Sequence, residues 1–372
     1  MALGARDTTS LVMLTGWDAT ELQNYKLQDG TTYASIVSML NAGLGALNAE
    51  FTSHPLWSSL VSYQDMPEVE YRVGVSNGFQ DHTEYSRPDP QRASTEGHML
   101  PIKAHDRGLG WTWDYLRKAR TSQIEADIAD AIKDARDKWR VKVLTRLLQR
   151  GDDSGTNKGL GSSGYSPGFA TTAASTSVDF VPPAYGGTTF ASTHEHYVGI
   201  TGGAATLASF QDAKEEIREH GHEPPYDFIT GPSDETAIRA LTGFVAADSA
   251  WVEYSALQDR VGFSQTAQAP GIYPIGALED FRIWVVRGMP QYYGFGWKSY
   301  GANSQRNPLR VRVDKGLSTP MVTAMTDPRA GNATTPIQYL MMFLEFGVGV
   351  GDRTNGTPRY WNNATWSDGT PT

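Results

Sequence analysis

An amphipathic stripe of 30 residues, 121–150, constrains the fold of this chain more than any other feature. Apolar residues recur every three or four positions, with acidic residues early in the stripe and basic residues late. That order complements a helix dipole, and Ser122 with Glu125 fits a capping box at the start. The pattern predicts a single helix about 45 Å long, well above the usual length, that serves as the spine of a domain. The stripe consists of Ile124, Ile128, Ala131, Ala135, Trp139, Val143 and Leu147.

Residues 66–118 predict two extended strands joined by a long polar loop. Val69, Tyr71 and Val73 alternate with polar residues, which is typical of a strand. A stretch rich in His, Glu, Arg and Pro continues as far as His98, and a second extended run covers residues 99–104. A loop of about 20 residues inside a compact domain usually binds something or is disordered. We therefore expect this segment to project and to bury itself on a neighbouring molecule.

The remaining elements are mixed helices and strands, without an internal repeat. Residues 1–65 predict an arm with one amphipathic helix, and residues 206–220 predict a second helix closed by Gly221. The stretch DFITGPSDETAIRAL predicts a strand, a Gly-Pro turn and a helix capped by Ser233. The apolar runs FRIWVV and LRVRVD predict further strands. The helix in the arm rests on Tyr33, Ile36, Val37, Leu40, Leu44 and Leu47.

The composition excludes several classes of protein. The chain has 372 residues, 39% of them apolar, which is enough for one large core or two to three smaller ones. It has no cysteine, so disulfides and thiol catalysis are excluded. A net charge of -9 argues against electrostatic binding of nucleic acid or an anionic membrane. Without a signal peptide or a membrane-length apolar run, we expect a soluble protein made in a cytoplasm.

Three glycines near the C-terminus, Gly347, Gly349 and Gly351, resemble a phosphate-binding loop only superficially. A dinucleotide fingerprint needs G-x-G-x-x-G before a helix, and a Walker loop needs Gly-Lys-Ser/Thr. The sequence has neither. Spacing two places the glycines on one face of a strand, where they mark close approach of another backbone. The segment therefore predicts a strand followed by a turn at Asn355-Gly356.

Histidines occur in two pairs at spacing two, His194 with His196 and His220 with His222. Imidazole is a zinc ligand, and residues two apart share a strand face. Glu195 points the other way in such a strand, and no helical H-E-x-x-H motif is present. The sequence therefore favours half-buried strand histidines over a metal site. A hydrolase or metalloenzyme centred on His194 and His196 is the alternative.

No other pattern forms a catalytic set. The G-x-S-x-G match around Ser166 has no strand before it and no helix after it. Glu215 and Glu216 fall opposite the apolar side of the helix expected at 206–220, which predicts a solvated face. Aromatic clusters fit core packing first and interface anchoring second. They comprise Trp111, Trp113 and Tyr115, and Tyr292, Tyr293, Phe295 and Trp297.

The order of these elements resembles the major capsid proteins of tailed bacteriophages, which have the Hong Kong 97-type fold. The polar hairpin of residues 66–117 resembles that family's extended loop, and residues 121–150 resemble its spine helix. The helix at 206–220 followed by DFITGPSDETAIRAL resembles part of its axial domain. FRIWVVRGMP resembles a late strand of the same domain, and LEFGVGVGDRTNGTPRYW resembles the final strands of the peripheral domain.

The resemblance implies an α+β, Hong Kong 97-like fold with five segments. These are an N-terminal arm at 1–65, an extended loop at 66–118, a peripheral domain at 119–192 that contains the spine helix, an axial domain at 193–335, and returning peripheral strands at 336–372.

The resemblance also implies a structural protein rather than an enzyme. Its copies would form hexamers and pentamers of an icosahedral shell that encloses double-stranded DNA without binding it specifically. Portal, scaffolding and decoration proteins are further implied partners, and a membrane is not. The implied location is the virion capsid, after assembly in the host cytoplasm. No catalytic, cofactor-binding or metal-binding residues are expected. The residues expected to contact other subunits are Asn77, Gly78, Glu84, Arg87, Arg92, Lys103, Trp111 and Trp113.

Two further alternatives stay open at the level of the sequence. An encapsulin-like nanocompartment would use the same fold to enclose a protein cargo, and the contents of the particle separate it from a phage shell. A carbohydrate-binding module that uses the aromatic residues would be a small monomer.

Overall fold

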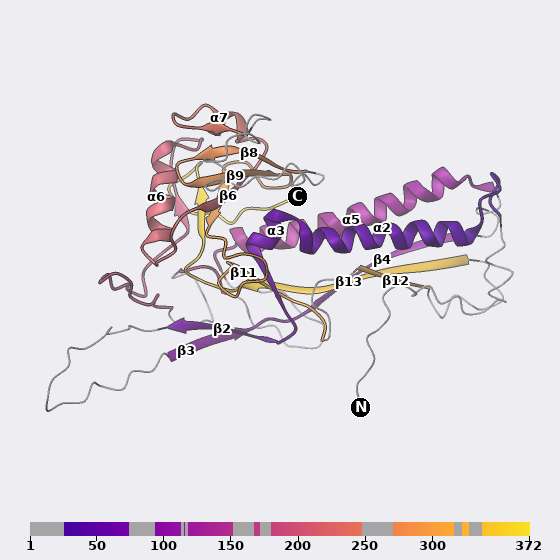
Figure 1. Cartoon of the computed structure of the whole chain (residues 1–372), viewed down its shortest axis with the longest axis horizontal. Coiled ribbons are helices and arrows are strands. Elements are labelled where there is room, and N and C mark those ends of the chain that lie inside the picture. The colour runs from indigo at the N-terminus through magenta and orange to yellow at the C-terminus, as the bar shows by residue number, and fades with distance from the viewer. Residues whose placement is uncertain are drawn as a thin grey trace. The chain divides into compact units, whose positions relative to one another are not determined.

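The structure is a computed structural model of the chain (Figure 1). It describes residues 26–73, 94–112, 115, 118–151, 167–171, 180–247, 271–315, 322–326 and 337–372. The chain divides into two compact units, which are treated separately. The first comprises Met1–Ser53, Ile102–Arg140 and Val313–Gly347, and the second His54–Pro101, Val141–Arg312 and Val348–Thr372. The five-segment division expected from the resemblance stays a prediction.

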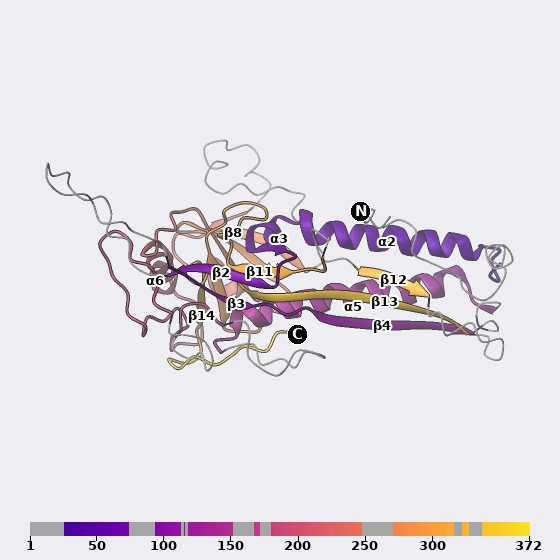
Figure 2. The ribbon, with the colours of Figure 1, turned by 90° about the horizontal axis from the view of Figure 1, so that it is seen from below.

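The first unit is a layer of two helices over a sheet (Figures 1 and 2). β13 pairs antiparallel with β4 on one side and with β12 on the other. The expected arm helix is confirmed, and so is the spine helix, which ends slightly before residue 150. The elements are α2 (Tyr33–Ser53), β4 (Lys103–Thr112), β12 (Val322–Thr326) and the greater parts of α5 (Thr121–Leu148) and β13 (Ile337–Val350), whose last residues are counted with the second unit.

Aromatic rings join the helices and the sheet of the first unit. The ring of Trp139 on α5 lies 5.1 Å from that of Phe51 on α2 and 5.1 Å from that of Phe346 on β13, between centroids. All three side chains are buried, and each such pair contributes about 0.5–1.5 kcal/mol beyond its buried area. The periodic stripe of α5 is buried as expected, at Ile124, Ile128, Ala131, Trp139, Val143, Leu144, Leu147 and Leu148.

The capping box predicted at the start of α5 is wrong, because the helix already begins at Thr121. The backbone N–H of Thr121 donates to the carboxylate of Asp29 at 2.8 Å. An acceptor near a helix N-terminus is favourable whichever segment supplies it, so Asp29 takes the place of Ser122 and Glu125. Hydrogen bonds from Thr121 hold the pKa of Asp29 below its usual range.

The second unit is built on a seven-stranded mixed sheet with the strand order β5-β14-β10-β6-β9-β8-β7. α6 packs on this sheet through Phe210, Ala213 and Ile217, which share one buried cluster with Phe228 and Phe281. The predicted helix at 206–220 is confirmed with Thr206 as its cap. The elements are β5 (Val198–Gly199), α6 (Leu207–Arg218), β6 (Tyr226–Thr230), α7 (Glu235–Arg239), β7 (Val245–Ala246), β8 (Ile272–Leu278), β9 (Phe281–Val286), β10 (Tyr293–Trp297) and β14 (Thr357–Tyr360).

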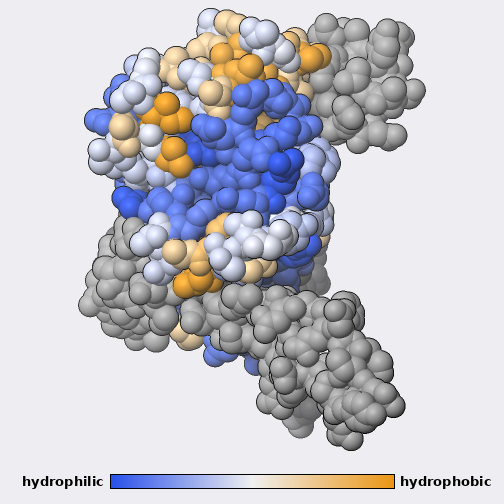
Figure 3. All heavy atoms as spheres, turned by 90° about the vertical axis from the view of Figure 1, so that its left-hand side faces the viewer, coloured by the Kyte–Doolittle hydropathy of each residue, from blue (hydrophilic) through white to orange (hydrophobic). Residues whose placement is uncertain are grey.

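The outer face of α6 is polar. Gln211, Asp212, Glu215 and Arg218 are exposed. α6 lies on the side of the second unit that Figure 3 presents, where hydrophilic residues form a broad band with small apolar patches at its margins. This face has the character of a solvated surface. No helix in the described part of the chain is long and apolar enough to span a bilayer.

Two further strand pairs complete the second unit. After α3 (Pro55–Leu60), β1 (Val61–Gln64) runs parallel to β11 (Leu309–Arg312). β2 (Glu68–Val73) and β3 (Ser94–Met99) form an antiparallel hairpin. The sequence predicts the first of these strands but places the second at 99–104, and reads residues up to His98 as a loop.

The extended run that the sequence predicts at 99–104 is not one strand. It contains the end of β3 and the start of β4. β3 stops at Met99 and β4 starts at Lys103, with Pro101 between them. Proline cannot donate a ladder hydrogen bond, so it interrupts the run.

Two sequence predictions at turns had opposite outcomes. Ser233 is not the cap of α7, because Asp234 holds that position and makes no side-chain capping bond. The glycine-rich segment is a strand, as predicted: β13 ends at Val350 and a turn leads into β14. At Gly351 an added Cβ would lie 3.2 Å from the carbonyl oxygen of Asn307. A close backbone approach therefore explains this glycine.

Candidate functional site

The root of the β2–β3 hairpin is fixed by hydrogen bonds to neighbouring strands. The side-chain amide of Gln64 donates to the carbonyls of Met66 and Glu68 at 2.9 and 2.8 Å. The guanidinium of Arg312 donates to the carbonyl of Leu100 at 2.9 Å. Side chains therefore hold both the entry and the exit of the hairpin in place.

Beyond this root, the described residues of the hairpin are partly exposed: Val69 is 2% exposed, whereas Glu68, Glu70 and Met99 are exposed. In the described part of the chain, β2 and β3 pair only with each other. Glu70 and Gly97 face one another in the register, and a Cβ on Gly97 would lie 2.7 Å from the carbonyl oxygen of Val69. Met66 is 69% exposed at the base. An isolated two-stranded hairpin is marginally stable in water, so this segment gains from contact with another surface.

Only two of the eight residues expected to contact other subunits lie within the described residues. Lys103 begins β4 opposite Phe346 of β13. Trp111 is buried in the first unit, and its indole N–H donates to the carboxylate of Asp127 on α5 at 2.9 Å. Their contact with other subunits stays a prediction. The other six, Asn77, Gly78, Glu84, Arg87, Arg92 and Trp113, lie outside the described residues.

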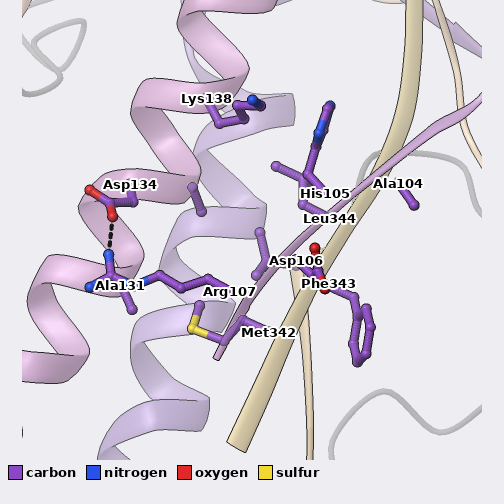
Figure 4. Close-up of a pocket in the computed structure, with 12 residues that line it drawn as sticks. Ala104, His105, Asp106, Arg107, Ala131, Asp134, Lys138, Met342, Phe343 and Leu344 are labelled. Atoms are coloured by element: carbon purple, nitrogen blue, oxygen red, sulfur yellow. Dashed lines mark hydrogen bonds and ion pairs between the residues drawn. The ribbon is translucent and has the colours of Figure 1, made fainter. Parts of the chain in front are cut away.

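The first unit contains a cavity of about 400 Å³ between α5 and the strands β4, β12 and β13 (Figure 4). Arg107 reaches from β4 to the carboxylate of Asp134 and donates to the carbonyl of Asp130 at 3.0 Å. Met342 and Leu344 of β13 supply part of the apolar lining. The charged and titratable part of the lining comes from His105, Asp106, Arg107, Asp134 and Lys138. The ion pair links the helix to the sheet.

The second unit brings three histidines to one point. The distances between their Nε2 atoms are 3.0 Å for His194 and His196, 3.0 Å for His194 and His220, and 2.9 Å for His196 and His220. The carboxylate of Glu219 lies 3.1 Å from Nε2 of His194 and 3.7 Å from Nε2 of His220. These four residues are called the histidine cluster below.

The sequence identifies this cluster only in part. It pairs His194 with His196, and it excludes Glu195, which turns away and binds Arg150 at 2.7 Å. His220 joins the cluster because it follows the end of α6. His222 lies elsewhere, with its ring nitrogens 2.7 Å from the hydroxyl of Tyr300 and 3.0 Å from that of Thr354.

Burial lowers the pKa of two members of the histidine cluster, His196 and His220. Burial, together with the other two histidines, holds the pKa of His196 well below its usual range. Burial lowers the pKa of His220 to about 3. The Nδ1 atom of His196 lies 2.7 Å from the carbonyl oxygen of Gly356. A carbonyl only accepts, so Nδ1 carries the proton and Nε2 presents a lone pair to the cluster.

One carboxylate expected on a solvated face is buried. Glu215 is exposed and pairs with Arg218, as predicted. Glu216 instead turns inward, where Arg359 of β14 donates to it at 2.9 Å and the hydroxyl of Thr357 also contacts it. The Ser166 motif lies outside the described residues. Phe295 and Trp297 are fully buried, in agreement with the preference for core packing.

Solved structures align with most of this chain. A chain from Mycobacterium phage Patience aligns with a TM-score of 0.61 and 18% sequence identity, over 98% of this chain and 97% of that chain. A chain from the capsid of a native GTA particle gives 0.48 at 13% identity, over 83% and 90% of the two chains. A chain from the holo-SrpI encapsulin complex of Synechococcus elongatus PCC 7942 gives 0.44 at 11% identity, over 85% and 89%.

No protein-family model and no curated protein matches the sequence. Similarity at these identities concerns the fold. The expected α+β, Hong Kong 97-like fold class is confirmed, and this chain shares the fold of the Mycobacterium phage Patience chain along nearly its whole length.

Proposed function

We propose that this chain is the major capsid protein of a tailed bacteriophage and assembles into hexamers and pentamers of an icosahedral shell. The observation that carries the proposal is the shared fold with the Mycobacterium phage Patience chain, which extends over 98% of this sequence. A fold alone does not determine a function, so the proposal also needs support from this chain's own features.

The β2–β3 hairpin provides that support. It is clamped at its root by Gln64 and Arg312 and has no third strand among the described residues. A two-stranded hairpin is marginally stable by itself and is stabilised by burial on a partner, and closed symmetric assemblies supply the same partner surface at every position. In this proposal each hairpin clamps a neighbouring subunit.

The charge of the chain fits a container for DNA. Binding to phosphates requires clustered basic residues, whereas this chain carries a net charge of -9. The proposed shell therefore encloses double-stranded DNA without binding it specifically. Portal, scaffolding and decoration proteins complete the proposed set of partners. The proposed location is the virion capsid, after assembly in the host cytoplasm, and the proposed role is structural rather than enzymatic.

Electron microscopy of the expressed full chain tests the proposal. We expect closed shells from the wild-type chain. In a deletion variant that lacks residues 74–93 and joins β2 to β3 through a two-residue turn, we expect folded subunits that do not close into shells. A matched control replaces residues 74–93 with a Gly/Ser linker of equal length. It distinguishes the effect of loop length on shell closure from the effect of the loop side chains.

Two outcomes would contradict this function, and one would contradict the role of the hairpin alone. A wild-type chain that stays a monomer at high concentration would remove shell assembly. Unchanged shells after the deletion would remove the clamping role of the hairpin. Shells isolated from their natural source with a protein cargo in place of DNA would favour the nanocompartment.

A further inference from the structure

We propose that His194, His196, His220 and Glu219 form a binding site for a divalent transition metal ion, with zinc as the best fit. The site lies wholly within the second unit. It is independent of the proposed shell function, since it concerns the folding of one chain.

The geometry of the histidine cluster matches tetrahedral coordination. Zinc bonds of about 2.0–2.1 Å to nitrogen or oxygen place ligand atoms about 3.3 Å apart. The three Nε2 separations are 2.9, 3.0 and 3.0 Å, and the two distances from Glu219 are 3.1 and 3.7 Å. All four ligand atoms lie within 4.8 Å of one another. Shifts of a few tenths of an ångström would therefore seat the ion.

Hydrogen bonds alone do not account for this convergence. Nε2 of His196 is a bare lone pair, because its Nδ1 donates to Gly356. His220 can donate to it, and His194 can donate to Glu219. The contact of 3.0 Å between His194 and His220 then joins two N–H donors. A cation removes this conflict, since it binds the lone pairs of all three rings at once.

The surroundings have the features of a metal site. Ligating histidines generally donate their second ring nitrogen to a carbonyl or carboxylate, which fixes the tautomer, and His196 does so. Phe190 lies 4.9 Å from the ring of His194 and 4.3 Å from that of His220, and so forms an apolar wall. The side chains of His194 and Glu219 are 20% and 35% exposed, whereas that of His220 is 1% exposed. Among the described residues, the His194 and Glu219 side of the site therefore reaches solvent.

The choice of zinc follows from the ligand types. Three imidazoles and one carboxylate suit zinc, and also cobalt, nickel and copper, more than magnesium or calcium, which prefer all-oxygen sites. Four protein ligands fill a tetrahedron and leave no open position, which is typical of structural rather than catalytic zinc.

The consequence for the fold is a crosslink in a chain without cysteine. The ion would join the segment before β5, through His194 and His196, to the end of α6, through Glu219 and His220. His196 would extend the link to Gly356, next to β14. An ion that binds only the folded state stabilises it by mass action, and at a concentration of about 100 times Kd we expect Tm to rise by about 5–10 °C.

The test uses the purified full chain after treatment with a chelator. We expect one zinc ion per chain by elemental analysis, a rise in Tm on adding zinc, and visible absorption bands of tetrahedral cobalt on adding Co²⁺. A wild-type chain without stoichiometric zinc and without these cobalt bands would overturn the proposal.

Variants of the two most exposed ligands, His194 and Glu219, distinguish a specific zinc site from adventitious zinc binding. We expect His194→Ala to lower the zinc affinity at least about 100-fold and His194→Cys to retain it, because a thiolate also ligates zinc. Glu219→Gln should weaken binding about 10–100-fold, whereas Glu215→Gln, an exposed carboxylate on the same helix, should leave it unchanged. Equal affinity in the wild type and His194→Ala would overturn the proposal. If His194→Ala does not fold, equal affinity in Glu219→Gln and Glu215→Gln would do so instead.

Discussion

The guanidinium of Arg359 donates a hydrogen bond of 2.9 Å to the carboxylate of Glu216, and the two side chains are only 2% and 13% exposed. The pair joins α6 to β14 inside the second unit. Burial raises the pKa of Glu216 to about 7, against the opposing effects of Arg359 and Thr357. The attachment of α6 thus combines an apolar face with one buried polar link.

Breaking this pair is expected to destabilise the second unit. Arg359→Met removes the partner of a buried carboxylate, which typically costs about 3–5 kcal/mol. Arg218→Met is the matched control, because its pair with Glu215 is exposed and worth about 0–1 kcal/mol. Urea unfolding followed by tryptophan fluorescence measures both. Equal losses in the two variants would show that burial of the Arg359 pair has no energetic consequence.

Two glycines of α2 provide a matched test of packing in the first unit. A Cβ on Gly45 would meet nothing within 4 Å, whereas one on Gly43 would lie 2.6 Å from Cδ1 of Ile132 on α5. Alanine is favoured over glycine in a helix by about 0.5–1 kcal/mol. We expect Gly45→Ala to gain that amount in free energy of unfolding and Gly43→Ala to gain less or to lose stability. Equal gains in the free energy of unfolding for the two variants would contradict the close contact between Gly43 and Ile132 of α5.

The elements that the sequence predicts well are those whose signal is local. The stripe of α5 and the apolar face of α6 are periodic, and burial of those faces fixes both helices. Strand β13 was predictable for the same reason, because the spacing of its glycines is a short-range feature. The turn after it runs from Asp352 to Asn355, so the predicted Asn355-Gly356 pair lies at its end.

The contacts that the sequence missed join residues far apart in the chain. The capping-box prediction was wrong because the carboxylate of Asp29, 92 positions away, accepts the hydrogen bond from the backbone N–H of Thr121 at the start of the helix. Glu215 and Glu216 look alike in the helical pattern, and only Arg359, 143 positions from Glu216, separates them. The histidine cluster likewise combines residues that a local pattern predicts with one that it does not. His194 and His196 carry a local signal, whereas His220 joins them only through the path of α6.

The stability of the second unit should depend on pH through Asp234. Burial raises the pKa of this carboxyl to about 6, against the opposing effect of the N–H of Tyr292. The folded state therefore holds a proton more tightly than the unfolded state, whose pKa is near 3.8, so this group's contribution to stability falls as pH rises from about 4 to 6.

Asp234→Asn keeps an acceptor for Tyr292 and cannot ionise. We expect it to match the wild type below about pH 4 and to exceed it by about 1 kcal/mol above pH 6, a value reduced for solvent screening. Urea unfolding across this range measures the difference, with the exposed Asp212→Asn variant as control. A variant less stable than the wild type at pH 7 would contradict the prediction.

The hairpin offers the most direct link between local geometry and assembly. Gly97 is paired with Glu70, and a Cβ at Gly97 would lie 2.7 Å from the carbonyl oxygen of Val69. That neighbour is a backbone atom, so the contact is relieved only if the strands move apart. Overpacking of this kind costs about 1–3 kcal/mol, and an isolated hairpin has little stability to lose.

We therefore expect Gly97→Val to lower the hydrogen-exchange protection of β2 and β3 and to reduce the yield of closed shells. Glu70→Val, which adds the same side chain to the opposite strand at a position that already carries a Cβ, should retain both properties. If Gly97→Val assembled as well as Glu70→Val despite unpaired strands, the hairpin would not need its β-structure to join subunits.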